Sequence, residues 1–381
     1  MRYRNFGGLD WRPSALGFGA MRLPYLGGDT GRIDEPLSIR MIRHAIDHGV
    51  NYVDSAYSYH KGNSEVAVGK ALRDGYRERV KLATKMPTWL VNSTADMDRC
   101  LDQQLGKLQT DHVDFYLLHG LNKDRWPKIR DLGVFDWAEK VKEEGKIMHL
   151  GFSFHDDYKL FHSILEDSDH FTLCQIQYNY MDEDYQAGTK GLKEAADKGL
   201  ALVVMEPIKG GKLAVTPPPQ VQRIWDGAKV KRKPAEWALR WVWNHPEVSV
   251  VLSGMSEMYQ VEENLIYADR SGPNVMEPWE LKLVSKVREA YGELGFVGCT
   301  ACRYCMPCPQ GVEIPDILGL YNEYYMSGQS GEIKKKYQEK IRPEGRADKC
   351  VACGRCEEQC PQHLPIRRFM AEIPRVFPKP Q

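Results

Sequence analysis

The side chains with the most specific chemistry are cysteines near the carboxyl end of the chain. Eight of the ten cysteines form two runs, each followed by a proline: Cys299, Cys302, Cys305 and Cys308, then Cys350, Cys353, Cys356 and Cys360. Three thiolates at steps of three residues can bind one face of a cubane cluster, and a fourth thiolate before proline can reach a different cluster. The two runs therefore predict two 4Fe-4S clusters.

The spacing also bears on how the ligands are shared between the clusters. The second run has two, two and three residues between its cysteines, as in the bacterial two-cluster pattern, whereas the first has only two before Cys308. Under the two-cluster rule, Cys360 joins the first three cysteines of the first run, and Cys308 joins the first three of the second. The shorter gap leaves open which cluster Cys308 and Cys360 each bind.

Zinc and disulfide bonds explain the two runs less well. Zinc sites use two separated pairs of ligands, so the third cysteine and the proline of each run have no role there. Disulfide bonds are typical of secreted chains, but residues 1–10 contain no apolar core of a signal peptide, and no run of eighteen apolar residues occurs. We therefore expect a cytoplasmic protein that spans no membrane.

A second set of ionisable residues lies in the first third of the chain and comprises Asp54, Tyr59, Lys85 and His119. Such a set suits the reduction of a carbonyl group, because hydride addition leaves an alkoxide that needs a proton. The Tyr59 phenol can supply that proton if Lys85 stabilises phenolate and Asp54 holds the ammonium. His119 can orient the substrate or relay protons. Each residue alone also has a structural interpretation, such as a buried core histidine or a snorkelling lysine.

The surrounding sequence predicts the elements that position these residues. Short apolar runs alternate with stretches whose apolar residues recur every three or four positions, a pattern typical of parallel strands with crossover helices. The predicted strands are 16–21, 52–54, 80–85, 113–119, 147–153, 173–177, 201–205 and 248–252. The predicted helices include 38–48, 64–73, 94–108, 135–144, 157–165, 187–198, 234–243 and 256–268.

Eight strand–helix units within about 270 residues predict an α/β fold, a (β/α)8 TIM barrel with its chemistry at the carboxyl ends of the strands. Asp54, Lys85 and His119 each end a predicted strand, and Tyr59 follows Asp54 in a loop. Their common place at one rim favours a catalytic set over four separate structural residues.

These motifs resemble those of the aldo-keto reductase superfamily over the first 270 or so residues. The signature Asp-x-Ala-x-x-Tyr is met by Asp54-Ser55-Ala56-Tyr57-Ser58-Tyr59, and later motifs by Gly62-Asn63-Ser64-Glu65, Ala83-Thr84-Lys85 and Leu117-Leu118-His119-Gly120. The resemblance implies that Asp54, Tyr59, Lys85 and His119 are the catalytic tetrad. It also implies a nicotinamide cofactor bound extended across the barrel mouth.

The resemblance implies contacts to the nicotinamide and pyrophosphate of that cofactor. Ser153 and Gln175 occupy positions that hold the carboxamide, although Phe154 stands where asparagine is usual. Met205 stands where many relatives stack a tyrosine on the ring, and a thioether can pack there too. Residues 206–213 resemble the pyrophosphate loop, with candidate contacts at Pro207, Lys209, Gly211 and Leu213 and charge from Lys209 or Lys212. A Gly-rich turn without a ligand is the alternative.

The adenosine end of the cofactor corresponds by resemblance to residues 254–264. The candidate contacts are Gly254, Gln260, Glu263 and Asn264. Relatives that prefer NADP usually place arginine or lysine here to bind the 2′-phosphate, and this stretch contains neither. Family habit favours NADP and the missing cation favours NAD, so the choice stays open.

The domain organisation follows from these assignments. Residues 1–275 are expected to form the barrel, 276–295 a helical linker, and 296–381 a small, mainly helical domain that resembles a two-cluster bacterial ferredoxin. Lys+Arg and Asp+Glu balance at 52 each, so no net charge draws the protein to nucleic acid or to an anionic membrane. The expected partners are a small-molecule carbonyl substrate and a redox partner protein.

Three functional hypotheses fit the sequence. The first is an NAD(P)H-dependent oxidoreductase that reduces an aldehyde or ketone to an alcohol, or the reverse, with clusters for electron transfer or regulation. The second is an iron–sulfur electron-transfer protein that uses the barrel as a docking scaffold, and in the third the clusters are purely structural. Hydride carries two electrons and a cluster passes one, so direct exchange normally needs a flavin, for which no clear motif occurs. Trp89, Tyr25 and Tyr57 could line an aromatic substrate pocket.

Overall fold

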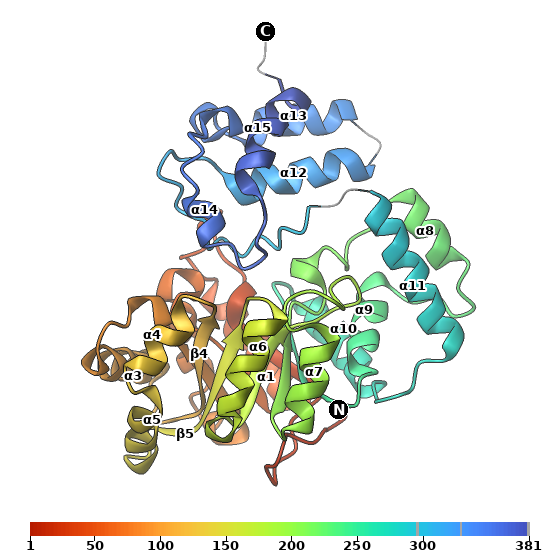
Figure 1. The fold of residues 1–381 in the computed structure, drawn as a ribbon. Coiled ribbons are helices and arrows are strands. Elements are labelled where there is room, and N and C mark those ends of the chain that lie inside the picture. The colour runs from red at the N-terminus through yellow and green to blue at the C-terminus, as the bar shows by residue number, and fades with distance from the viewer. Residues whose placement is uncertain (295–296, 328–329, 379–381) are drawn as a thin grey trace. The chain divides into compact units, whose positions relative to one another are not determined.

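The computed structural model describes residues 1–294, 297–327 and 330–378. Its first part is a closed barrel of parallel strands that follow one another in sequence order, with β1 paired to both β2 and β8 (Figure 1). The strands are β1 Leu16–Gly19, β2 Tyr52–Asp54, β3 Lys81–Met86, β4 Val113–Leu121, β5 Ile147–Phe154, β6 Leu173–Gln177, β7 Ala201–Met205 and β8 Val248–Gly254. The predicted (β/α)8 architecture is confirmed.

Helices alternate with these strands. They are α1 Glu35–Asp47, α2 Ser64–Ala71, α3 Thr94–Leu108, α4 Arg125–Asp131, α5 Val134–Glu143, α6 Tyr158–Ile164, α7 Gly188–Asp197, α8 Pro219–Asp226, α9 Pro234–Trp243 and α10 Met258–Asp269. Short 3-10 turns are η1 Ala20–Arg22, η2 Tyr59–Gly62, η3 Arg77–Arg79, η4 Thr88–Leu90, η5 Leu165–His170 and η6 Lys209–Gly211.

The sequence explains where these helices begin and which face they bury. Helix α1 begins after Asp34, whose carboxylate accepts a hydrogen bond from the Leu37 amide, and Ser93 caps α3 in the same way through the Asp96 amide. Such caps satisfy amides that have no partner within the helix. Both helices bury apolar residues at three- and four-residue steps, which packs them on the strands.

The structure corrects one detail of the sequence prediction and adds two helices to it. The first strand ends at Gly19, not Met21, because the Ala20 carbonyl accepts a hydrogen bond from the Ser64 hydroxyl and the chain turns into η1. Helices α4 and α8 lie outside the predicted helical windows. Both contain a proline near the amino end, Pro127 and Pro219, where the first helical turn tolerates it.

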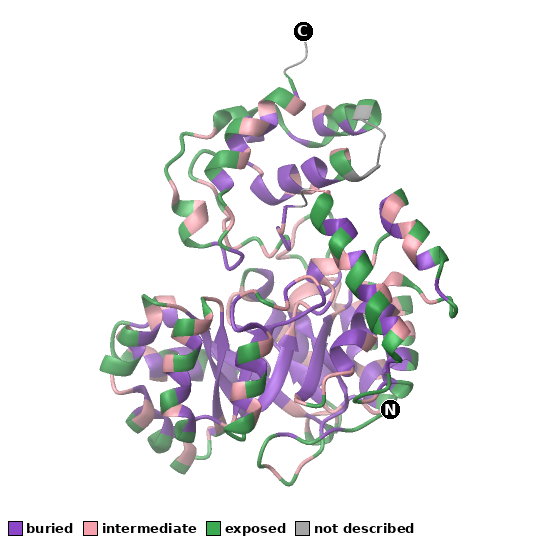
Figure 2. Cartoon of the chain, turned by 45° about the vertical axis from the view of Figure 1, so that its right-hand side comes forward, coloured by how far each residue is buried: buried purple, intermediate pink, exposed green. Residues whose placement is uncertain are grey.

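One end of the barrel is closed by the amino-terminal segment. Phe6 is fully buried against Tyr52, Phe115 and Val250, which lie near the amino ends of their strands. The strands are buried along most of their length (Figure 2). The interior is therefore packed, and loops at the carboxyl ends of the strands are left to form a site.

Contacts between residues divide the chain into two compact units. The first comprises Met1–Pro207 and Leu239–Val275, and the second comprises Ile208–Ala238 and Met276–Gln381. The second unit contains α11 Pro278–Glu293, α12 Ile314–Ser327, α13 Ser330–Lys340, η7 Pro343–Gly345, η8 Ala347–Lys349, α14 Arg355–Glu358 and α15 Ile366–Val376. Segment 208–238 thus groups with the carboxyl-terminal residues, although the sequence places it in the barrel.

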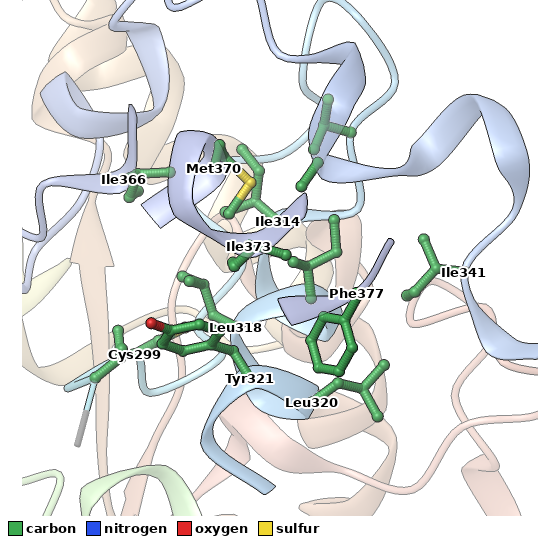
Figure 3. Close-up of a cluster of buried hydrophobic side chains, with 14 of the residues drawn as sticks. Cys299, Ile314, Leu318, Leu320, Tyr321, Ile341, Ile366, Met370, Ile373 and Phe377 are labelled. Atoms are coloured by element: carbon green, nitrogen blue, oxygen red, sulfur yellow. The ribbon is translucent and has the colours of Figure 1, made fainter. Parts of the chain in front are cut away.

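The second unit has its own hydrophobic core, in which cysteines take part. Figure 3 shows this core, where Leu318 and Tyr321 of α12 meet Met370 and Ile373 of α15 beside Cys299. Helix α11 lies within the predicted linker 276–295. Residue 295 of that linker and residue 296 of the predicted third segment lie outside the described residues. In the described ranges, no helix combines the length and apolarity needed to cross a bilayer.

Candidate active site and cluster sites

The structure brings the four candidate catalytic residues together at the carboxyl ends of neighbouring strands. Asp54 ends β2, Lys85 lies in β3, His119 lies in β4 and Tyr59 begins η2. The Lys85 Nζ lies 2.6 and 2.7 Å from the carboxylate oxygens of Asp54 and 3.4 Å from the Tyr59 hydroxyl oxygen. The His119 ring meets the Tyr59 ring edge-on, with 6.0 Å between centroids. An ammonium thus sits between a carboxylate and a phenol.

The electrostatics of this group follow from its burial. Asp54, Lys85 and His119 are 2%, 1% and 3% exposed. Burial lowers the pKa of Lys85, and the Asp54 carboxylate opposes that shift. Burial also lowers the pKa of His119 well below its usual range, and the positive charges of Lys85, His155 and Arg125 add to the effect. The imidazole is therefore neutral at pH 7 and can hydrogen-bond a carbonyl without carrying charge.

Tyr59 is held by a strained turn. The two residues that follow it, His60 and Lys61, have left-handed φ values of +52° and +55°. Each such non-glycine residue costs about 1–2 kcal/mol, so surrounding contacts must enforce the turn. Thr30 binds the His60 Nδ1 through its carbonyl oxygen at 2.7 Å, and Asp29 binds the Lys61 ammonium at 2.7 Å. The loop before α1 therefore fixes the position of the phenol.

A buried carboxylate supports Lys85 from behind, and the sequence prediction assigned it no role. Glu65 of α2 is fully buried and accepts hydrogen bonds from Thr84 Oγ1 at 2.6 Å and Gln104 Nε2 at 2.5 Å. Gln104 also donates to the Lys85 carbonyl oxygen at 3.1 Å, and Lys107 Nζ lies 3.5 Å from the second Glu65 oxygen. The sequence signals for this network are the motif that contains Glu65 and a glutamine on the apolar face of α3.

Aromatic and cationic side chains lie beside His119. The Trp89 ring lies 5.1 Å from the His119 ring between centroids, and the Arg125 guanidinium lies 5.2 Å from the Trp89 ring centroid. Of the other aromatic candidates, Tyr57 donates from its hydroxyl to Gln103 in an exposed position, and Tyr25 is 45% exposed. Trp89 is therefore the aromatic candidate that contacts the catalytic group.

The candidate nicotinamide contacts lie on successive strands. Ser153 of β5 pairs in register with Gln175 of β6, both are 1% exposed, and Met205 ends β7. Ser153 Oγ accepts a hydrogen bond from the Gly120 amide at 2.7 Å. The Gln175 Oε1 has no hydrogen-bond partner among the described residues. Because a buried acceptor normally has a donor, Gln175 fits the N–H of a carboxamide such as that of nicotinamide.

The candidate pyrophosphate segment forms a chain of unusual backbone conformations. After Pro207, φ is +49° at Lys209, +67° at Gly210 and +93° at Gly211. The amides of Gly211 and Leu213 donate to the Ile208 carbonyl oxygen at 3.0 and 3.1 Å, so the segment folds tightly on itself. Because these amides are used within the turn, the charge for an anion would come from Lys209 or Lys212.

Most candidate adenosine contacts also have structural roles. Gln260 Oε1 accepts from the amide of Glu257, the N-cap of α10, at 3.3 Å and from the Ser256 amide at 2.8 Å. Glu263 accepts from the Tyr267 hydroxyl, and Asn264 donates to Ser253 Oγ at 3.0 Å. Gly254, the fourth candidate, ends β8.

The candidate adenosine contacts all lie within 254–264 and include no cation. The structure places Arg22 beside one of them. A Cβ at Gly254 would lie 3.0 Å from the Arg22 Cγ, so the Arg22 side chain packs closely on the backbone at the end of β8. The Arg22 guanidinium also lies 4.0 Å from the Glu206 carboxylate, which follows β7. No local pattern signals this placement, because Arg22 reaches β8 through the closure of the barrel.

The eight cysteines of the two runs line two cavities in the second unit. Four cysteines line one cavity, namely Cys299, Cys302, Cys305 and Cys360. The other is lined by Cys308, Cys350, Cys353 and Cys356, with Cys305 again at its edge. These groups match the shared ligand sets of the two-cluster rule.

The two runs have the same local conformation, which also fits cluster binding. The Ala301 amide lies 3.4 Å from the Cys299 Sγ, and the Ala352 amide lies 3.4 Å from the Cys350 Sγ. Both alanines have left-handed φ values, +54° and +55°. Amide hydrogen bonds to thiolate sulfur are one of the interactions that set cluster potentials. Burial raises the pKa of Cys356 to about 11, so iron must displace its thiol proton.

Comparison with known proteins finds two family models that match successive parts of the chain. A model of the aldo/keto reductase family matches residues 15–271, and a model of the 4Fe-4S dicluster domain matches residues 298–364. The chain is 34% identical over 165 residues to aldo-keto reductase YhdN of Bacillus subtilis, a match covering 40% of this chain and 47% of that protein. It is 26% identical over 292 residues to probable aldo-keto reductase 1 of Glycine max, covering 66% and 80%.

Solved structures show the same barrel. The holo form of aldo-keto reductase AKR11C1 from Bacillus halodurans superposes with a TM-score of 0.63 at 27% identity, covering 75% of this chain and 96% of that one. An aldo-keto reductase from Klebsiella pneumoniae in complex with NADPH has a TM-score of 0.60 at 23% identity, covering 76% and 96%, a likeness of fold alone. Since the family model spans more than half of the residues, this chain belongs to the aldo/keto reductase family and carries a 4Fe-4S dicluster domain at its carboxyl end.

Proposed function

We propose that the protein is an NAD(P)H-dependent oxidoreductase that reduces an aldehyde or ketone to an alcohol, or catalyses the reverse reaction. The observation that carries this proposal is the contact between the Lys85 ammonium and the Tyr59 phenol at 3.4 Å, beside a buried neutral imidazole. Family membership supports it, and the structural relative from Bacillus halodurans has been solved in a holo form.

Tyr59 acts as the general acid in this proposal. When bound, the dinucleotide supplies hydride to the carbonyl carbon or takes it in the reverse direction. The carbonyl oxygen gains negative charge and takes the phenolic proton of Tyr59. Lys85 stabilises the phenolate that remains, and its bidentate pairing with Asp54 holds the ammonium in place.

His119 orients the substrate in this scheme. Its buried, neutral ring can donate a hydrogen bond to the carbonyl oxygen without the desolvation cost of a charge. Trp89 packs beside the same ring and restricts the approach of the carbonyl compound.

The dinucleotide is bound by residues that follow several strands. Gln175 and Ser153 hold the carboxamide, Met205 packs on the nicotinamide, and residues 207–213 bind the pyrophosphate. Gly254, Gln260, Glu263 and Asn264 contact the adenosine half. Arg22, seated on Gly254, supplies the cation that the 254–264 stretch lacks, which favours NADPH over NADH.

The clusters are bound by the crossed sets of four cysteines that line the two cavities. We assign them a part in electron transfer to a redox partner protein or in regulation. A purely structural part is the second candidate, because Cys299 and Cys360 are 9% exposed within the hydrophobic core of their unit.

The test of the enzyme proposal is dinucleotide oxidation with a panel of aldehydes and ketones. We expect Tyr59→Phe to lower kcat by about 10²-fold or more, the range of general acid catalysis. Tyr57→Phe is the matched control, because the Tyr57 hydroxyl bonds Gln103 on an exposed surface. Unchanged turnover in Tyr59→Phe, or absence of turnover in the wild type with every carbonyl compound, would refute the proposal.

A further inference from the structure

We propose that the cluster bound by Cys299, Cys302, Cys305 and Cys360, here the first cluster, controls the affinity of the protein for its dinucleotide. The link is the phosphate loop, defined as residues Lys209–Leu213. This inference rests on the proposed function, in which the phosphate loop binds pyrophosphate, and adds a regulatory role for one cluster.

The phosphate loop packs backbone to backbone on the segment that enters the first cysteine run. A Cβ at Gly210 would lie 2.4 Å from the Thr300 carbonyl oxygen and 2.9 Å from its Cα. No side chain fits into that space, and φ of +67° at Gly210 also requires glycine. Thr300 itself is 1% exposed and follows Cys299 directly.

A side-chain contact fixes the other end of this junction. Lys212 donates a hydrogen bond from Nζ to the Val297 carbonyl oxygen at 3.4 Å. The aliphatic end of Lys209, which is 6% exposed, lies beside Gly298, with its Cε 3.7 Å from a Cβ built there. Residues 297–300 therefore run along the phosphate loop, with contacts at Val297, Gly298 and Thr300.

The same short segment is anchored to the core around the cysteines. Asn322 of α12 is 5% exposed and spans Val297, donating to its carbonyl oxygen and accepting from its amide, both at 2.9 Å. The Val297 carbonyl thus accepts from Asn322 on one side and Lys212 on the other. Cys299 lies in the hydrophobic core with Leu318 and Tyr321 of the same helix.

A second connection holds the chain that follows the phosphate loop. Arg232 pairs with Glu280 of α11 at 2.5 Å, and the Glu280 side chain is 3% exposed. Trp237 of α9 meets Trp279 of α11 edge-on, with 6.3 Å between ring centroids. These contacts explain why segment 208–238 groups with the cluster-binding residues.

The energetic consequence is a linkage between two ligands. Binding of the first cluster orders Cys299 and its neighbours. Because Val297 and Thr300 contact the phosphate loop, the conformational freedom of the loop decreases as well. A loop ordered in advance binds pyrophosphate at a lower entropic cost, so cluster loading tightens dinucleotide binding. By reciprocity, the dinucleotide stabilises the first cluster against loss of iron.

The experiment measures the NADPH dissociation constant under anaerobic conditions by fluorescence titration, together with the iron content. Wild type is compared with Cys299→Ser, which removes a ligand of the first cluster, and with Cys353→Ser, its matched control at the second cluster. We expect Cys299→Ser to weaken NADPH binding about tenfold, within the usual range of coupling between sites, and Cys353→Ser to change it less than threefold.

A variant that keeps all eight cysteines guards against general unfolding. In Asn322→Leu the clamp on Val297 is lost, and we expect full iron content with NADPH binding weakened about threefold or more. Equal dissociation constants in wild type, Cys299→Ser and Asn322→Leu would overturn the inference and leave the proposed function standing. Equal weakening in Cys299→Ser and Cys353→Ser would also overturn it, because the effect would not belong to the first cluster. Absence of NADPH binding in the fully loaded wild type would refute the proposed function itself.

Discussion

Removal of the Lys85 ammonium should separate the catalytic from the structural role of the buried ion pair. At 3.4 Å, a full ammonium–phenolate pair is worth about 5 kcal/mol at an effective dielectric constant of about 20. The transition state carries only part of that phenolate charge, and half of it corresponds to about 2.5 kcal/mol, or a decrease of about 70-fold in kcat. We therefore expect Lys85→Met to lower kcat by about 10²-fold while the KM for the dinucleotide changes little.

The same substitution leaves the Asp54 carboxylate buried without its cation. Such a change typically costs about 3–5 kcal/mol of stability, so the melting temperature of Lys85→Met should decrease by several degrees. The double variant Lys85→Met with Asp54→Asn removes the orphaned charge. We expect it to recover part of the stability and none of the activity.

The assay is anaerobic NADPH oxidation at saturating carbonyl substrate, paired with urea unfolding of each variant. A Lys85→Met protein whose kcat stays within threefold of wild type would refute the role of the ammonium. Recovery of kcat in the double variant would show that the loss was structural and not electrostatic.

Three further substitutions test other parts of the site. Glu65→Gln removes a buried charge that raises the pKa of Lys85, so the alkaline limb of the pH profile of kcat should move to lower pH. The control Glu78→Gln, at an exposed position, should leave that limb in place. Burial holds the pKa of His119 below its unfolded value of about 6.5, so below that pH the unfolded chain binds a proton that the folded chain does not. Stability should therefore decrease as pH falls below about 6.5, and urea unfolding of His119→Gln should show a weaker decrease than wild type. Arg22→Gln should raise the KM for NADPH about tenfold and the KM for NADH much less, because a charge-assisted contact is lost. An equal effect on both KM values would contradict a 2′-phosphate contact. The control is Arg40→Gln at an exposed position.

The barrel was predictable because its signals are local. Strands β2, β6 and β7 have the bounds that the sequence predicts, since each is a short, fully or largely buried run of three to five residues that follows a helix. The two cysteine runs could likewise be recognised as two cluster sites from their spacing, although the shorter gap before Cys308 left open which cluster Cys308 and Cys360 each bind. The sequence could also place Asp54, Lys85 and His119 at one rim, because parallel strands of a barrel end on the same side.

The remaining features depend on contacts between distant segments. Glu65 acquires its role from Gln104, 39 positions later, and Arg22 meets Gly254 only because β1 pairs with β8. The sequence places segment 208–238 in the barrel, yet in the structure Gly210 packs on the backbone of Thr300, which belongs to the predicted third segment. Hydrophobic periodicity carries no information about such pairings, because polar and glycine contacts depend on the folded chain.

The most direct test of the carbonyl reductase account is a single-turnover reaction with oxidised clusters. Anaerobic protein is mixed with one equivalent of NADPH and excess carbonyl substrate, while cluster absorbance near about 400 nm and alcohol formation are followed together. The account predicts one alcohol per NADPH consumed and no bleaching of the clusters. Bleaching of the clusters by NADPH without alcohol formation would contradict it and would identify the protein as an electron carrier.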